Sequence, residues 1–111
     1  MPSEQFIDKD ISLYLSYISE VKNLSQNTTS SYKRDLQKLS IFLYSINIKD
    51  YDEIDDGVCT SWLGKLYSLE NNPKTIQRHL SSAKGFFRFL KKNSIIDSSP
   101  FELVKAPKSP S

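Results

Sequence analysis

The sequence predicts an all-α fold of four helices followed by a C-terminal linker, and three observations support this prediction. The chain has only three glycines in 111 residues. It lacks any run of alternating apolar and polar residues bounded by tight turns, so strands are not expected. Apolar residues recur instead at helical spacing in four segments. The length allows one domain with a single modest core.

An apolar series at positions i, i+4 and i+7 predicts the first helix, over about residues 5–22. Ser25 then suits the N-cap of a second helix over about residues 26–46, and Leu24 can pack onto that helix as a hydrophobic staple. The apolar residues of these two helices are Ile7, Ile11, Tyr14, Leu15, Ile18 and Val21, then Tyr32, Leu36, Leu39, Leu43 and Ile46.

The polar segment 47–56 breaks the helical period and is predicted to be a loop. Five of the eight residues 49–56 are acidic and one is Lys. Asp55 suits the N-cap of a third helix over about residues 56–68, and the charge of Asp56 would complement its dipole. The side chains predicted to point inward from this helix are Val58, Trp62, Leu63 and Leu66.

The fourth helix is predicted to begin after the capping residue Asn72, with Pro73 in its first turn, and to end near Asn93. On a helical wheel, four further apolar residues fall within about 40° of Ile76: Leu80, Ala83, Phe87 and Leu90. The opposite side collects cations and small residues: Lys74, Arg78, Ser81, Gly85, Arg88 and Lys92, with Gln77 at its edge. Residues 71–96 hold six basic residues and no acid.

This acid-free face has two interpretations. Exposed helices usually mix both signs of charge and so gain ion pairs between turns, which this helix cannot form. Cations interleaved with small residues can approach a phosphate backbone closely, as docking of a helix into the major groove requires. The plainer interpretation is a solvated face. The second helix adds three cations and one acid: Lys33, Arg34, Lys38 and Asp35.

Several single residues invite a chemical role, and each has a structural alternative. A nucleophilic Tyr needs a cluster of Arg and His, whereas Tyr32 lies on an apolar helix face. His79 is the only histidine, so a structural or phosphate-contacting role is expected for it rather than metal ligation or general base catalysis. Cys59 and Trp62 lie one turn apart and are expected in the core. Two phenylalanines on the flank of the fourth helix either fill a wide core or form a patch for another domain: Phe86 and Phe89.

Composition excludes several classes of site and location. A single cysteine permits neither an intrachain disulfide nor a Cys-based metal site, and it fits a reducing cytoplasm. Residues 1–10 lack the basic and then apolar pattern of a signal peptide, and no apolar run approaches the length of a membrane span. Residues 49–56 lack the Gly and the ordered alternation of a calcium loop, so a solvated loop is expected there.

The chain beyond Asn93 is predicted to lose regular structure, because it holds five serines and three prolines. A short turn over residues 101–105 is expected to dock one of three apolar side chains on the core: Phe101, Leu103 or Val104. Residues 106–111 are predicted to be a linker, which suggests an attached domain.

Three motifs, in order, resemble those of tyrosine recombinases of the Xer and phage-integrase kind, and together they cover about residues 6–108. The first is an opening helix from about residue 6, followed by a turn and a second helix: Leu24, Ser25, Thr28, Tyr32, Arg34, Asp35 and Leu36. The second is the fourth helix: Thr75, Ile76, Leu80, Ser81, Phe86, Phe87, Phe89 and Leu90. The third is the exit from the domain: Ser99, Pro100, Val104, Pro107 and Lys108, with Ser where the family has Asn.

The resemblance implies a SAM-like core-binding domain over residues 1–105, built as an orthogonal four-helix bundle, and a linker over residues 106–111. Such a domain is the N-terminal half of a clamp around duplex DNA, with its second and fourth helices toward the major groove. The family's catalytic domain follows the linker and supplies Arg, Lys, a His-x-x-Arg motif and the nucleophilic Tyr. Since His79 is followed by Leu80, Ser81 and Ser82, it does not match that motif, and this chain is expected to have no catalytic residue, cofactor or metal.

The resemblance and the helical wheels together nominate twelve residues for DNA contact: Thr28, Ser31, Lys33, Arg34 and Lys38 in the second helix, and Lys74, Thr75, Gln77, Arg78, Ser81, Lys84 and Arg88 in the fourth. Lys and hydroxyl groups should contact phosphates, while Gln77 and Arg78 are the better candidates for base edges. The expected partners are double-stranded DNA and, in a full-length bacterial cytoplasmic recombinase, the catalytic domain and sister protomers of a synaptic tetramer. The isolated domain is expected to be a monomer. The alternative is a helical protein-interaction module without DNA affinity, using the Phe86 and Phe89 flank and the acidic loop.

Overall fold

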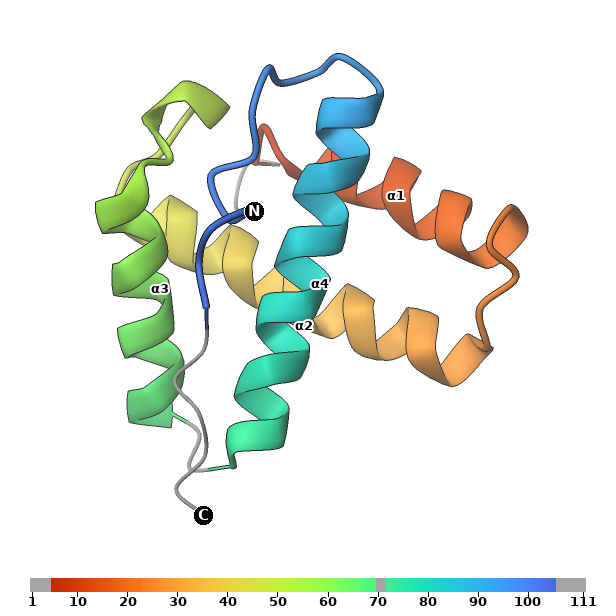
Figure 1. Cartoon of the computed structure of the whole chain (residues 1–111), viewed down its shortest axis with the longest axis horizontal. Coiled ribbons are helices and arrows are strands. Elements are labelled where there is room, and N and C mark those ends of the chain that lie inside the picture. The colour runs from red at the N-terminus through yellow and green to blue at the C-terminus, as the bar shows by residue number, and fades with distance from the viewer. Residues whose placement is uncertain (1–4, 70–71, 106–111) are drawn as a thin grey trace. The chain divides into compact units, whose positions relative to one another are not determined.

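The structure is a computed structural model that describes residues 5–69 and 72–105 (Figure 1). The elements along these residues are α1 (Asp8–Glu20), α2 (Gln26–Ser45), the 3-10 turn η1 (Tyr51–Glu53), α3 (Asp56–Leu69) and α4 (Pro73–Lys92). Over this described part of the chain there is no strand, so the predicted all-α fold is confirmed. Each helix begins and ends within three residues of its predicted bounds. The predicted linker over residues 106–111 lies outside the described residues.

Two compact units make up the chain, Met1–Glu53 and Ile54–Ser111. The first unit contains α1, α2 and η1, and the second contains α3, α4 and the turn that follows α4. No helix within the described ranges is both long enough and apolar enough to cross a membrane.

In the first unit, α1 buries most of its predicted apolar stripe: Ile7, Ile11, Tyr14 and Ile18 are nine-tenths or more buried. The prediction was wrong for Val21, which is 70% exposed. The helix ends at Glu20, and Asn23 then takes a left-handed φ of 56°. Val21 is therefore the C-cap residue and no longer follows the buried stripe.

Three hydrogen bonds fasten α1, and Gln5 just before it, to the rest of the first unit. The hydroxyl of Ser40 on α2 donates to Asp8 Oδ1 at 2.6 Å, and Gln5 Nε2 donates to the carbonyl of Ser40 at 3.1 Å. From η1, the hydroxyl of Tyr51 donates to Asp10 Oδ2 at 2.6 Å. The ring of Tyr51 also meets Phe6 edge-on, with centroids 4.9 Å apart. Part of the predicted loop is thus an ordered turn held against α1.

The C-terminus of α2 closes with a Schellman motif, which changes one predicted core residue. Asn47 adopts φ 67°, its amide donates to Tyr44, and the amide of Ile48 donates to the carbonyl of Leu43 at 2.9 Å. Because the helix ends at Ser45, Ile46 is 41% exposed rather than inward, and Ile48 is buried instead.

In the second unit, α3 begins as predicted, because Asp55 Oδ1 accepts from the amide of Val58 at 2.9 Å. Three residues of α3 are buried, namely Cys59, Trp62 and Leu66, while Val58 and Leu63 are only partly covered. The predicted stripe of α4 is confirmed in full, since Ile76, Leu80, Ala83, Phe87 and Leu90 are all buried.

The chain turns back after α4 and docks one aromatic ring. Ser94 takes φ 59°, and the amide of Ile95 donates to the carbonyl of Leu90 at 2.9 Å, which ends the helix. Phe101 is fully buried and stacks on Phe87 with centroids 5.1 Å apart. The expected docking of this turn is therefore confirmed, and Phe101 is the residue that docks, since Leu103 is 89% exposed.

Candidate nucleic-acid interface

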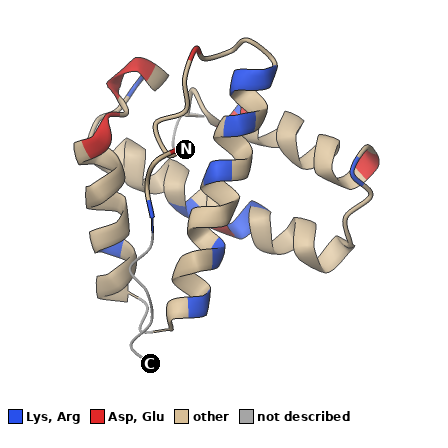
Figure 2. Cartoon of the chain, viewed as in Figure 1, with Lys and Arg blue, Asp and Glu red and all other residues tan. Residues whose placement is uncertain are grey.

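One side-chain hydrogen bond and a proline mark where α4 begins. Asn72 Oδ1 accepts from the amide of Lys74 at 2.9 Å, and Pro73 occupies the first turn, as predicted. The helix then runs to Lys92 with no Asp or Glu in it. Figure 2 shows Lys and Arg recurring along α4, whereas Asp and Glu gather around η1 and the start of α3.

The buried stripe of α4 leaves the predicted polar side in contact with solvent. Five of its seven nominated residues are exposed: Lys74, Gln77, Arg78, Ser81 and Arg88. Thr75 and Lys84 are partly buried. We refer to the exposed and partly buried residues Lys74, Gln77, Arg78, Ser81, Lys84 and Arg88 as the α4 basic face. It combines four cations with two neutral polar side chains and no carboxylate.

Two side chains near this face belong to the core instead. His79 is only 2% exposed, and its ring meets that of Trp62 edge-on at 6.2 Å between centroids. Of the two roles expected for His79, its burial supports the structural one, because a phosphate cannot reach a ring that solvent does not. Phe86 is fully buried and contacts Phe87 edge-on at 5.2 Å. Of the two interpretations of Phe86, the filling of a wide core is therefore confirmed, while Phe89 keeps some exposure.

The nominated residues of α2 do not form one face. Ser25 Oγ accepts from the amide of Thr28 at 3.1 Å and donates to its hydroxyl at 2.9 Å, so Thr28 takes part in the predicted N-cap. Arg34 Nη2 donates to Ser31 Oγ at 3.3 Å, which places these two side chains together. Lys38, one turn beyond Arg34, continues this exposed row. We call Ser31, Arg34 and Lys38 the α2 basic row.

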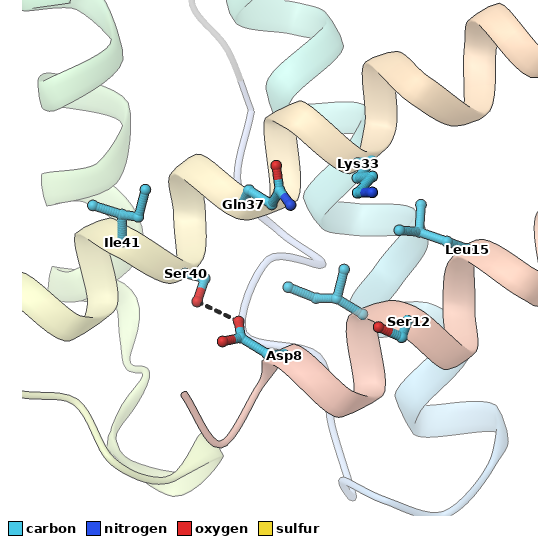
Figure 3. A pocket seen from close by; sticks show the side chains of 8 residues that line it. Asp8, Ser12, Leu15, Lys33, Gln37, Ser40 and Ile41 are labelled. Carbon is cyan, nitrogen blue, oxygen red and sulfur yellow. Dashed lines mark hydrogen bonds between the residues drawn. The ribbon is translucent and has the colours of Figure 1, made fainter. Parts of the chain in front are cut away.

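Lys33 lies apart from that row. It lines a hollow between α1 and α2 of about 410 Å³, together with Asp8, Ile11, Ser12, Leu15, Gln37, Ser40 and Ile41. Figure 3 shows Lys33 and Gln37 on α2 and Asp8 and Ser12 on α1 around this hollow, with the Ser40 to Asp8 hydrogen bond at one end. A carboxylate among the lining residues makes this a mixed site rather than a purely basic one.

A second hollow, of about 250 Å³, lies beside α4 and involves a residue that the sequence analysis did not nominate. Its lining residues are Gln77, Leu80, Ser81, Lys84 and Lys105. Lys105 was missed because it follows a proline-containing segment in which no regular structure was expected. Phe101 packs against Phe87 of α4, and this tertiary contact brings the segment that contains Lys105 back toward α4.

Two reactive side chains, Cys59 and Tyr51, are held in structural contacts. No cluster of three or more His, Cys, Asp or Glu suited to a metal occurs within residues 5–69 and 72–105. Burial, together with the charges of Asp56 and Asp55, raises the pKa of the Cys59 thiol to about 12. Burial also raises the pKa of Tyr51 well above its ordinary value, reinforced by its hydrogen bond to Asp10.

Comparisons of the sequence with known proteins match most of this chain to one domain family. A protein-family model described as "Phage integrase, N-terminal SAM-like domain" matches residues 11–94. The tyrosine recombinase XerD of Staphylococcus epidermidis is 32% identical over 95 residues, which cover 86% of this chain and 32% of the relative. XerC of Anoxybacillus flavithermus is 28% identical over 98 residues, covering 88% of this chain and 33% of the relative. The chain thus spans about a third of the length of the curated relatives it matches. No solved structure matches it.

Proposed function

Because the chain belongs to the family of phage-integrase N-terminal SAM-like domains, we propose that it binds duplex DNA as the N-terminal domain of a site-specific tyrosine recombinase. The observation that carries the proposal is α4, a helix with one fully buried stripe, an exposed basic face and no acid. Because α4 itself contains no carboxylate, no ion pair can form between its own turns, whereas a row of phosphates would neutralise positive charge along the helix.

The α4 basic face has the composition that a groove-docking helix needs. Lys74 and Arg88 supply charge for phosphates, and the short side chain of Ser81 lets the backbone approach closely. Gln77 and Arg78 carry the donor groups that can read base edges in the major groove. The α2 basic row of Ser31, Arg34 and Lys38, together with Thr28 and Thr75, completes the proposed contact set. Lys33 is left out of it, because it lines the mixed hollow that contains Asp8.

The roles of the whole recombinase are part of the same proposal. Residues 1–105 would form the DNA-binding domain and residues 106–111 the linker to a catalytic domain. Strand cleavage would then belong to the two thirds of the relatives' length that this chain does not match. The partners would be that catalytic domain and sister protomers of a synaptic tetramer, in the bacterial cytoplasm where the chromosome lies.

The burial of Phe86 weakens the alternative of a protein-interaction module, because that alternative relied on an exposed Phe86 and Phe89 flank. The acidic segment around η1 is also engaged, since the amide of Lys49 donates to Glu53 Oε1 at 2.7 Å and Tyr51 bonds to Asp10.

Fluorescence anisotropy of a labelled duplex of roughly 30 base pairs, titrated at several salt concentrations, tests the proposal. With Z phosphate contacts, log K falls against log salt with a slope of about −0.9Z, so a slope of about −3 or steeper is expected. Replacing Lys74 and Arg88 together by Ala should flatten the slope without lowering the melting temperature. Lys65→Ala is the charge control, because Lys65 is an exposed cation of α3. Absence of binding even at low salt would overturn the proposal for this chain and favour the interaction module.

A further inference from the structure

The hollow beside α4 combines residues of one helix row with a cation from a later segment. Gln77, Ser81 and Lys84 are spaced i, i+4 and i+7, so they stack along one edge of α4. Leu80 is buried and contributes an apolar edge. Lys105 comes from the segment after α4 and completes the lining.

Two contacts hold that later segment against α4. The first is the ring of Phe101 against that of Phe87. Within the segment, the amide of Val104 donates to the carbonyl of Phe101 at 3.2 Å. The second contact is an ion pair. Lys91 Nζ lies 4.0 Å from Glu102 Oε2. This ion pair is exposed and therefore weak. Glu102 is the acidic residue nearest to Lys105 in sequence, and its carboxylate lies toward Lys91. Glu102 does not line the hollow.

The lining offers donors and positive charge without a matching acid. Lys84 and Lys105 bring two ammonium groups, Ser81 a hydroxyl and Gln77 an amide. Two ammonium groups around one small volume repel each other unless an anion lies between them. Lys84 is partly buried, so its charge is less screened than that of a fully exposed lysine.

We propose that Ser81, Lys84 and Lys105 together bind one backbone phosphate of duplex DNA, which makes Lys105 a DNA contact outside the helices. This inference rests on the proposed DNA binding of α4. The hollow opens along an exposed helix edge, where a phosphodiester chain can enter and leave. The phosphate is therefore assigned to a polymer backbone rather than to a free anion.

Salt-dependent anisotropy of Lys84→Gln, Lys105→Gln and the double variant tests the proposal in the whole chain. Each single replacement should weaken duplex binding more than Lys65→Gln does. If both lysines hold the same phosphate, the double variant should flatten the salt slope by about 0.9, the value for one phosphate, rather than by about 1.8 for two. Its loss of binding should also be smaller than the sum of the single losses.

The possible outcomes separate this inference from the proposed function. If the unaltered chain binds duplex but Lys105→Gln behaves like Lys65→Gln, the shared phosphate site is wrong and DNA binding by α4 stands. If the losses from Lys84 and Lys105 simply add, each contacts its own phosphate and the single-site assignment is wrong. If the unaltered chain does not bind duplex, both proposals fail.

Inorganic phosphate added as a competitor at constant ionic strength distinguishes the source of the anion. For a backbone contact, millimolar phosphate should displace no more duplex than chloride of the same ionic strength. Selective displacement that Lys105→Gln abolishes would assign the hollow to a free anion and overturn the backbone assignment.

Discussion

The ring of Phe101 lies against that of Phe87, with centroids 5.1 Å apart and planes inclined by 34°. Both rings are fully buried, although Phe101 belongs to a segment of turns and α4 to a long helix. This contact fixes the course of the chain after α4, and Lys105 lies only four residues beyond it in sequence.

Phe101→Ala should lower the free energy of unfolding by about 3 kcal/mol or more, because it removes a large, fully buried side chain and leaves a cavity against Phe87. Urea denaturation followed by circular dichroism measures the loss. Leu103→Ala is the matched control, since Leu103 is 89% exposed two residues away, and it should change stability by less than about 0.5 kcal/mol. Equal, small effects of both changes would mean that the docked ring adds nothing to stability.

Tyr51→Phe should destabilise the first unit by about 1.5 kcal/mol at neutral pH, because the hydroxyl of Tyr51 donates to the carboxylate of Asp10 at 2.6 Å. Urea denaturation of both proteins at pH 7 gives the difference. Asp10 is partly buried and would lose this donor. Tyr44→Phe is the control, because Tyr44 is 58% exposed.

The same pair predicts a loss of stability at alkaline pH. The folded protein raises the pKa of Tyr51 through burial and its bond to Asp10, so above the ordinary tyrosine pKa of about 10 the unfolded chain loses a proton that the folded chain retains. The contribution of Tyr51 to the free energy of unfolding is therefore complete below about pH 10, and it falls as the pH rises above that value. The stability advantage of the unaltered protein over Tyr51→Phe should narrow between pH 9 and pH 11. A constant difference across that range would contradict the assignment.

Cys59 should resist thiol reagents in the folded protein. Its side chain is fully buried, and a pKa of about 12 leaves roughly one thiol in ten thousand ionised at pH 8. Reaction with a chromogenic disulfide should be slow in buffer and fast in concentrated urea, with one thiol per chain in both cases. Fast reaction without denaturant would show that the core around Cys59 opens readily.

Sequence reasoning succeeded where structure depends on neighbouring residues. Ser25, Asp55 and Asn72 were identified as caps because an N-cap bonds to an amide two or three residues ahead. It failed for the exposure of side chains at two helix ends, where a residue other than Gly, Asn23 or Asn47, takes a positive φ. The exposure of Ile46 follows from one such ending, which no periodic pattern shows.

The outward side of α4 was predictable, because it lies opposite the apolar stripe, and that stripe is buried as expected. The burial of side chains on the flanks of α4 stayed open, because it depends on which other elements pack there. Phe86 and His79 are covered, although the helical wheel placed them beside the stripe. Lys105 required the docking of Phe101, a contact that joins residues distant from each other in sequence.

Replacing two lysines of α2 should have unequal effects on DNA binding, although both are exposed and of the same charge. Lys38 continues the row of Ser31 and Arg34, whereas Lys33 lines the hollow that contains Asp8. Lys38→Gln should therefore flatten the salt slope of duplex binding by about 0.9, and Lys33→Gln should change it little. Anisotropy titrations of the two variants make a matched comparison, since each removes one positive charge from the same helix. Equal changes in the salt slope would mean that duplex binding depends on the net charge of α2 and not on the position of Lys38 in the α2 basic row.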